Sequence, residues 1–170
     1  MIGDTFPDGY GTSRKTQRQI KARWDVQALD DEFVRRVLWM MRIAKRNGHD
    51  LGIGGGARSA AQQRALFLAR HHVSPSGTIL FEGQRWALNT GAAPAAPPGR
   101  SWHEDDATPT GGMAVDMVGD LAWMQDNAGW FGLRTFANVN GEPWHIQPGE
   151  LPTARAPWTT PLPKWGATTK

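Results

Sequence analysis

The sequence contains no cysteine and only one tyrosine among its 170 residues. Without cysteine, the protein forms no disulfide and no thiolate zinc site, and it offers no cysteine nucleophile. Any metal ion must therefore be bound by histidine, aspartate or glutamate side chains. No run of apolar residues approaches the length of a membrane-spanning helix, so we expect no membrane insertion.

A signal peptide and a strongly basic surface are also lacking. The opening residues, MIGDTFPDGYG, have neither a basic region nor an apolar one, so we expect synthesis in the cytoplasm without a signal peptide. The formal net charge is only +3, and we expect no nucleic-acid partner. Basic residues gather early, in SRKTQRQIKAR, which favours a solvated segment; weak attraction to an anionic polymer is the alternative.

Length and composition are those of one globular domain, which we expect to be a monomer. Nine tryptophans are present, enough for some to fill a core and others to line a groove. We divide the sequence into an N-terminal lead-in over 1–28, a folded domain over 29–150 and a Pro/Thr-rich tail or linker over 151–170.

Hydrophobic spacing predicts a helix that begins after Asp30 or Asp31 and stops at the Asn-Gly pair 47–48. Its apolar residues at helical spacing are Val34, Val37, Leu38, Met41 and Ala44. A short strand over 51–55 should run into a glycine-rich turn, and a second helix over 59–72 should follow, with Ser59 as its cap.

The second half predicts strands with one short helix. Residues 73–100 read as a long loop, and 111–118 as a strand. A helix capped by Asp120 should follow, and 133–139 and 142–148 should form a hairpin around an Asn-Gly turn. Helices come before strands, so the fold class is α+β, with a small antiparallel sheet flanked by helices.

Three good metal ligands stand at the edges of predicted strands: His103 in RSWHEDD, Asp116 in GMAVDMV and His145 in EPWHI. Two imidazoles and one carboxylate are a normal ligand set for catalytic zinc and leave a fourth position open. Glu142 is well placed to act as a base without binding the metal. Arg58 could stabilise an oxyanion or hold a substrate carboxylate.

Each of these residues alone has a simpler interpretation. A lone histidine is more often structural, an aspartate in a strand is more often a cap or ion-pair partner, and Glu142 could pair with a surface arginine. His71 and His72 read as charges that complement a helix C-terminus, and His49 as a loop residue. The stretch GIGGGARS lacks the Lys-Ser/Thr ending of a phosphate loop, so a tight turn presenting Arg58 is favoured.

Taken together, SWH…GMAVD…EPWH resembles the signature S-x-H-x-x-G-x-A-x-D…E-x-W-H. This signature belongs to the zinc peptidases that include D-alanyl-D-alanine carboxypeptidases, D-Ala-D-Ala dipeptidases and phage L-alanyl-D-glutamate endolysins. GGARSAAQQ resembles the family's G-x-R-S-x-x-x-Q, and WMQDNAGWFGL resembles the helix before its last motif. The resemblance covers roughly residues 30–150.

The resemblance implies a Zn²⁺ ion bound by His103, Asp116 and His145. It also implies that Glu142 is the general base and that Arg58 faces the substrate carbonyl or carboxylate. The implied fold is a small α+β domain with an antiparallel sheet and the zinc at one side of the sheet.

Three further residues acquire roles from the resemblance. Ser101 and Gln63 become supporting groups at the substrate site, and Trp144 packs beside the metal and shapes the groove. The implied substrates are bacterial peptidoglycan stem peptides, cut next to a D-amino acid.

Two bonds remain open, L-Ala–D-Glu for an endopeptidase and D-Ala–D-Ala for a carboxypeptidase. The absent signal peptide favours a phage endolysin, or its catalytic module, that acts on the host cell wall after release. The alternatives are a non-catalytic cell-wall-binding or structural phage module of the same fold, and a cytoplasmic D,D-dipeptidase.

One departure from the signature is an insertion at 104–111. Twelve residues separate His103 from Asp116, where the family usually has six. We expect a solvated loop on the rim of the cleft. The alternatives are a specificity loop, a second cation site such as calcium, and replacement of Asp116 as ligand by Asp105 or Asp106.

Overall fold

The computed structural model describes residues 19–136 and 141–153. It confirms the α+β class, with two antiparallel sheets and flanking helices. The elements are α2 (Trp24–Gln27), α3 (Asp31–Arg46), β1 (Leu51–Gly55), α4 (Ala60–Arg70), β2 (His71–Val73), β3 (Ile79–Phe81), β4 (Gln84–Leu88), β5 (Val115–Gly119), α5 (Leu121–Asn127), the 3-10 helix η1 (Ala128–Phe131), β6 (Leu133–Phe136) and β7 (Glu142–Pro148).

Helix α3 forms where the apolar spacing predicts it. Asp30 is its N-cap, and its carboxylate accepts hydrogen bonds from the backbone N–H groups of Glu32 and Phe33 at 2.9 and 3.0 Å. Such a cap stabilises a helix by about 1 kcal/mol. All five apolar residues that predict the helix are buried in the core. The amphipathic pattern therefore fixes both the position and the buried face of this helix.

The larger sheet has four antiparallel strands in the order β1-β5-β7-β6. Strand β1 has the predicted bounds, and β6 and β7 pair as the predicted hairpin. The Asn-Gly turn of that hairpin lies partly at 137–140, outside the described residues. Strand β5 begins at Val115 rather than at residue 111, because Gly111 and Gly112 form a turn whose backbone bonds to Ala28 and Asp30.

The predicted loop over 73–100 is wrong in its first half, which forms a second sheet with the order β2-β4-β3. Glu82 and Gly83 make a two-residue turn between β3 and β4, both with positive φ (49° and 74°). These signs match the turn that joins tight hairpins. The strands are only three to five residues long, so their alternation is too brief to stand out in the sequence.

Helix α4 has the predicted Ser59 cap but ends at Arg70, two residues earlier than expected. His71 and His72 belong to β2 and do not extend the helix. The His71 side chain is buried, stacks on Phe67 at 4.4 Å and places Nδ1 3.0 Å from the Phe67 carbonyl oxygen. The interpretation of these two histidines as mere helix charges is therefore wrong for His71, which packs in a small aromatic core.

Asp120 occupies the predicted N-cap position of α5, where its backbone carbonyl accepts a hydrogen bond from the Met124 N–H at 3.2 Å. Asp120 precedes α5, but its carboxylate makes no cap bond to that helix. Instead it accepts a hydrogen bond from the Asp50 N–H at 3.0 Å and lies 3.3 Å from His49 Nδ1. The side chain thus ties the start of β1 to the end of β5.

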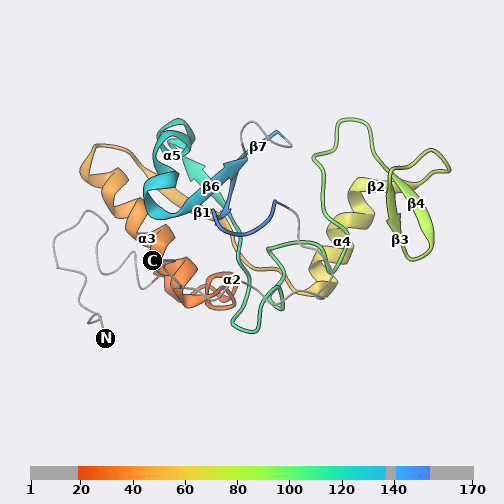
Figure 1. The fold of residues 1–170 in the computed structure, drawn as a ribbon, viewed down its shortest axis with the longest axis horizontal. Coiled ribbons are helices and arrows are strands. Elements are labelled where there is room, and N and C mark those ends of the chain that lie inside the picture. Colours follow the sequence, from red (N-terminus) through yellow and green to blue (C-terminus); the bar gives the residue numbers. More distant parts are fainter. Residues whose placement is uncertain (1–18, 137–140, 154–170) are drawn as a thin grey trace, which may run out of the picture.

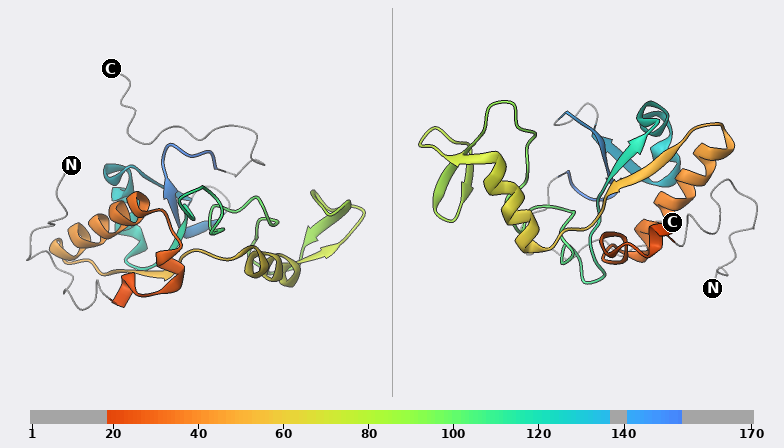
Figure 2. Two further views of the ribbon diagram at one scale, coloured as in Figure 1. Left: turned by 90° about the horizontal axis from the view of Figure 1, so that it is seen from below. Right: turned by 180° about the vertical axis from the view of Figure 1, so that it is seen from behind.

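Figures 1 and 2 show the arrangement of these parts. Helices α3 and α5 lie with the four-stranded sheet, while α4 and the three-stranded sheet form the opposite end of the molecule. The short helix α2 belongs to the main core, since Val26 is buried there. Among the described residues, no helix combines the length and apolar character needed to cross a membrane.

Candidate metal centre

The register of the larger sheet brings Asp116 beside His145. These residues face each other directly across the β5–β7 pair. Side chains alternate along a strand, so Asp116 projects away from its buried neighbours Val115 and Met117. A carboxylate and an imidazole from distant parts of the sequence thereby meet on one face of the sheet.

The third side chain, His103, comes from the loop before β5. Its backbone carbonyl accepts a hydrogen bond from the Arg58 N–H at 2.7 Å, which holds the loop against the turn after β1. Its ring Nδ1 donates to the Gly56 carbonyl oxygen at 2.9 Å. This bond fixes the tautomer, so the free electron pair of Nε2 points toward Asp116.

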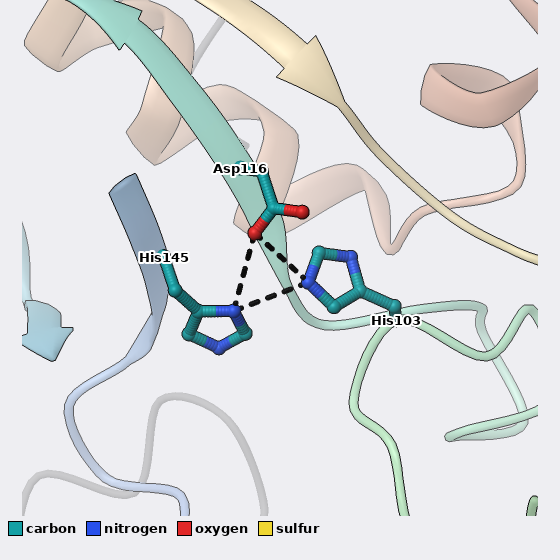
Figure 3. A group of neighbouring side chains, drawn as sticks. All are labelled: His103, Asp116 and His145. Carbon is teal, nitrogen blue, oxygen red and sulfur yellow. Dashed lines mark hydrogen bonds and ion pairs between the residues drawn. The ribbon is translucent and has the colours of Figure 1, made fainter. Parts of the chain in front are cut away.

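Three donor atoms converge in Figure 3: His103 Nε2, His145 Nδ1 and Asp116 Oδ1. The two nitrogens are 3.1 Å apart, and they lie 3.3 and 3.4 Å from the carboxylate oxygen. Zinc bonds of about 2.0–2.1 Å in tetrahedral geometry would place ligands roughly 3.4 Å apart. The donor types and their separations therefore fit a zinc ion. Within residues 19–136 and 141–153, no other group of three such ligands gathers this closely.

The protonation states also suit metal binding. Burial opposes ionisation of Asp116, but its close contacts with the His103 and His145 rings outweigh it and hold the pKa of Asp116 well below its usual range. Burial lowers the pKa of His103. At neutral pH the site thus offers an ionised carboxylate and a neutral buried imidazole, the forms that bind metal.

Arg58 stands beside the ligands. Its Nη2 donates to Asp116 Oδ2 at 2.8 Å, on the carboxylate oxygen that faces away from the histidines. Its Nη1 donates to Gln63 Oε1 at 3.3 Å, and buried Gln63 is itself anchored to the Ala96 carbonyl at 2.7 Å. This series of bonds orients both the arginine and the Asp116 carboxylate.

Glu142 begins β7, three residues before His145, and lines the same cleft. Burial raises the pKa of Glu142, and the nearby charge on Asp116 adds to this, while His145 opposes it. Ser101 and Trp144 also line the cleft. Ser101 is buried, and its hydroxyl accepts from the His103 N–H at 3.2 Å.

All eight residues singled out in the sequence thus line a single cleft of about 500 Å³. One wall comes from β5 and β7, and the facing residues come from α4 and the segment 94–103. The cleft is large enough for a short peptide, and its polar residues converge at the metal ligands.

Three supporting contacts were not predicted from the sequence. Gln147 Oε1 lies 3.4 Å from His145 Nε2, and its amide donates to the Pro152 carbonyl at 2.8 Å. Phe136 packs edge-on against the His145 ring at 4.7 Å. Because side chains alternate between the two faces of a strand, the sequence could have indicated Gln147, which is two residues from His145 on the same face. The Gly56 carbonyl has no signal of its own, because a backbone oxygen carries none.

The insertion at 104–111 is not the expected solvated loop. Glu104, Ala107 and Thr108 are buried. The Glu104 carboxylate accepts hydrogen bonds from the N–H groups of Gly99 and Ser101 at 2.9 and 3.0 Å. The segment therefore braces the loop that carries His103. Asp116 remains with the two histidines, and neither Asp105 nor Asp106 belongs to the three-ligand group found among the described residues.

Comparisons with known proteins give structural likenesses only. No protein-family model matches the sequence, and no curated protein matches it significantly. It is similar to a variant of the vancomycin-resistance D,D-pentapeptidase VanY in complex with Zn(II), with 20% identity, a TM-score of 0.49, and coverage of 71% of this protein and 72% of that one. It is also similar to the LdcB LD-carboxypeptidase, with 22% identity, a TM-score of 0.49, and coverage of 71% of this protein and 58% of that one. For VanYB in complex with D-alanine-D-alanine, the identity is 19%, the TM-score is 0.49, and the coverage is 71% of each protein.

Proposed function

We propose that this protein is a zinc-dependent peptidoglycan peptidase that hydrolyses a stem-peptide bond next to a D-amino acid. The observation that supports this most is the meeting of two histidines and an aspartate within 3.1–3.4 Å, in a cleft that also holds Glu142 and Arg58. A ligand set with an open position, a non-ligand carboxylate and a cation are the parts that metal-assisted peptide hydrolysis needs.

His103, Asp116 and His145 would hold the zinc, and Gly56 and Gln147 would orient the two imidazoles. When bound, zinc supplies Lewis acidity to the scissile carbonyl and to the attacking water. The buried position of His103 keeps its imidazole neutral for this purpose.

Glu142 moves the proton. Its carboxylate accepts a proton from the water as the water oxygen bonds to the carbonyl carbon. The same proton then passes to the amide nitrogen as the carbon–nitrogen bond breaks and the amine leaves. The raised pKa of Glu142 suits the first half of this transfer, because a less acidic carboxyl group is a better base.

Arg58 provides positive charge beside the reacting carbonyl. Two of its N–H groups are used by Asp116 and Gln63, and a guanidinium carries five. The side chain is 26% exposed and lines the cleft, so further donors can reach a substrate. There they would stabilise the negative charge that develops on the carbonyl oxygen.

The proposal extends to a lytic role as a phage endolysin or its catalytic module, acting on the host wall. Its support is the sequence resemblance of SWH…GMAVD…EPWH to a family that includes such enzymes. Clearing of a suspension of killed bacteria by the zinc-loaded protein tests this part, and an unchanged turbidity despite cleavage of isolated peptides would contradict it.

Digestion of purified peptidoglycan, with mass spectrometry of the fragments, tests the reaction itself. New N-termini at D-glutamate or D-isoglutamine would identify an L-Ala–D-Glu endopeptidase, whereas free D-alanine would identify a carboxypeptidase. Wall binding without release of either, by protein that holds stoichiometric zinc, would contradict hydrolysis and indicate a binding module.

Two variants separate proton transfer from metal binding. Glu142→Ala should keep its zinc and its fold while kcat falls by about 10²–10⁴-fold, because the general base is lost.

His145→Ala should lose zinc, as measured by elemental analysis after dialysis. His72→Ala is the matched control, because His72 lies outside the cleft and bonds to Asn89. Stoichiometric zinc in His145→Ala would remove His145 from the ligand set.

A further inference from the structure

The cleft carries two arginines that the proposed reaction does not use, Arg70 and Arg100. We infer that they form a subsite for a carboxylate of the stem peptide, away from the bond that is cut. This inference rests on the proposed function, since it names the part of the substrate that the same cleft recognises.

Arg70 is the last residue of α4 and is half-buried in the cleft wall. Its Nη1 donates to the Pro94 carbonyl oxygen at 3.2 Å. Within the described part of the protein, no carboxylate pairs with it. Its positive charge also acts on Glu142, whose pKa it lowers against the larger effect of burial. The guanidinium is thus held in the cleft with hydrogen-bond donors to spare.

Arg100 precedes Ser101 and is exposed at the same cleft. Its backbone N–H bonds to the Pro97 carbonyl at 3.1 Å, but no hydrogen bond or ion pair of its side chain occurs among the described residues. Other arginines have carboxylate partners: Arg23 with Asp25, Arg36 with Glu150, Arg58 with Asp116 and Arg64 with Glu82. Among the described residues, neither Arg70 nor Arg100 forms an ion pair with an acid.

The charges are distributed unevenly within the cleft. The acids Asp116 and Glu142 lie on β5 and β7, whereas Arg70 and Arg100 belong to α4 and the loop before Ser101. Asp116 is already paired with Arg58, whereas no acid is paired with Arg70 or Arg100 among the described residues, so a substrate carboxylate is attracted by these two arginines. Guanidinium groups bind carboxylates through paired, charge-assisted hydrogen bonds, so two arginines here would fix the direction of an acidic peptide.

The position of Arg70 indicates how far the recognised carboxylate lies from the reacting bond. Gln63, which contacts Arg58, is seven residues before Arg70 on the same helix. Seven residues advance a helix by about 10 Å. An extended peptide covers that length in roughly three residues. The carboxylate would thus lie about three residues from the reacting bond. It would belong either to an acidic residue within the stem or to the free C-terminus.

Three synthetic stem peptides test the subsite: one with both carboxylates, one with the internal D-glutamate amidated, and one with the C-terminus amidated. We expect one of the two amidations to lower kcat/KM of the wild type by about 10- to 100-fold, as loss of a charge-assisted pair should. That peptide identifies the carboxylate. In Arg70→Gln and in Arg100→Gln the same amidation should change kcat/KM much less. Compared with the wild type, both variants should cleave the unmodified peptide with a higher KM and an unchanged kcat.

Arg64→Gln is the matched control, because Arg64 lies on the same helix but pairs with Glu82 outside the cleft. It should discriminate between the peptides as the wild type does. If neither amidation alters kcat/KM of an active wild type, or if the arginine variants respond to amidation as the wild type does, the subsite is overturned while the proposed function stands.

Binding without turnover separates the two ideas. Calorimetry with the Glu142→Gln variant measures binding of the same peptides without cleavage, and the Kd should depend on the carboxylate. Adding Arg70→Gln to that variant should remove this dependence. Carboxylate-dependent binding without hydrolysis by the wild type would support the subsite and contradict the proposed function. Neither binding nor hydrolysis of any peptide would overturn both.

Discussion

At the scale of single residues, the backbone of Gly56 is hydrogen-bonded on one side to α2 and on the other side to the candidate metal centre. Its N–H donates to the Asp25 carboxylate at 2.9 Å, and its carbonyl oxygen accepts from His103 Nδ1 at 2.9 Å. A Cβ at this position would overlap the backbone carbonyl of Asp25. Glycine therefore allows two backbone segments to approach closely enough to set the orientation of the His103 ring.

The charge on Asp25 should make part of this junction sensitive to acid. Burial alone would raise the pKa of Asp25, but the Arg23 guanidinium and the Gly56 N–H outweigh it and lower the pKa below 3.8. The unfolded state then binds the proton more readily than the folded state. The ionised Asp25 carboxylate therefore stabilises the fold fully above about pH 4, and this stabilisation is lost as the pH falls through the lower pKa of the folded state.

Asp25→Asn should accordingly reduce the free energy of unfolding near neutral pH, and its difference from the wild type should shrink toward about pH 2. Urea unfolding across this range measures the difference, with exposed Asp126→Asn as the control for a lost charge. A difference that stays constant with pH would contradict the role given to the Asp25 carboxylate.

At the scale of elements, the insertion at 104–111 acts as a brace through Glu104. This side chain is 1% exposed and satisfies two backbone N–H groups in the loop before His103. In Glu104→Gln one acceptor becomes an amide donor, so a buried N–H loses its partner. We expect a loss of about 1–3 kcal/mol in urea unfolding. Asp105→Asn, at a partly exposed neighbour, should cost far less; equal losses would contradict the brace.

The elements differ in how far the sequence predicts them. Helix α3 and strand β1 follow from a long amphipathic pattern with a strong cap and from an apolar run before glycines. Strands β2, β3 and β4 are too short for alternation to be distinct, and their pairing depends on contacts with Phe67 that have no local signal. Tertiary packing, not local preference, decides that region.

The candidate site shows the same contrast. His103, Asp116, His145 and Glu142 stand out because their residue types and order match a known signature. The brace at Glu104 was not predictable, since an acidic run normally indicates solvent exposure. Its burial depends on two backbone N–H groups that become neighbours only when the loop folds.

At the scale of the whole molecule, the cleft lies between two parts with separate cores. Phe67 centres the smaller core, with ring contacts to His71, Phe81 and Trp86 at 4.4, 5.1 and 5.4 Å. The larger core contains α3 and the four-stranded sheet that carries Asp116 and His145. Figure 1 shows the two parts at opposite ends of the structure.

Phe67→Ala should therefore loosen one part more than the other. Removing a buried phenylalanine costs about 3–5 kcal/mol. Hydrogen exchange should lose protection over residues 71–88, while β1 and β5 keep theirs and zinc content is unchanged. Leu68→Ala, at a partly exposed neighbour on α4, is the control. Equal loss of protection in both sheets would show that they unfold together.

Because the walls of the cleft come from two parts of the structure, its two sides can differ in how they evolve. The groups proposed for chemistry belong mainly to the four-stranded sheet and its adjoining loop, whereas Arg70 and Arg100 belong to the opposite wall. Under the proposed function, substitutions of Arg70 and Arg100 would alter which peptide is accepted, because neither side chain belongs to the metal-binding group. Under that proposal, substrate choice and the reaction itself depend on different stretches of the sequence.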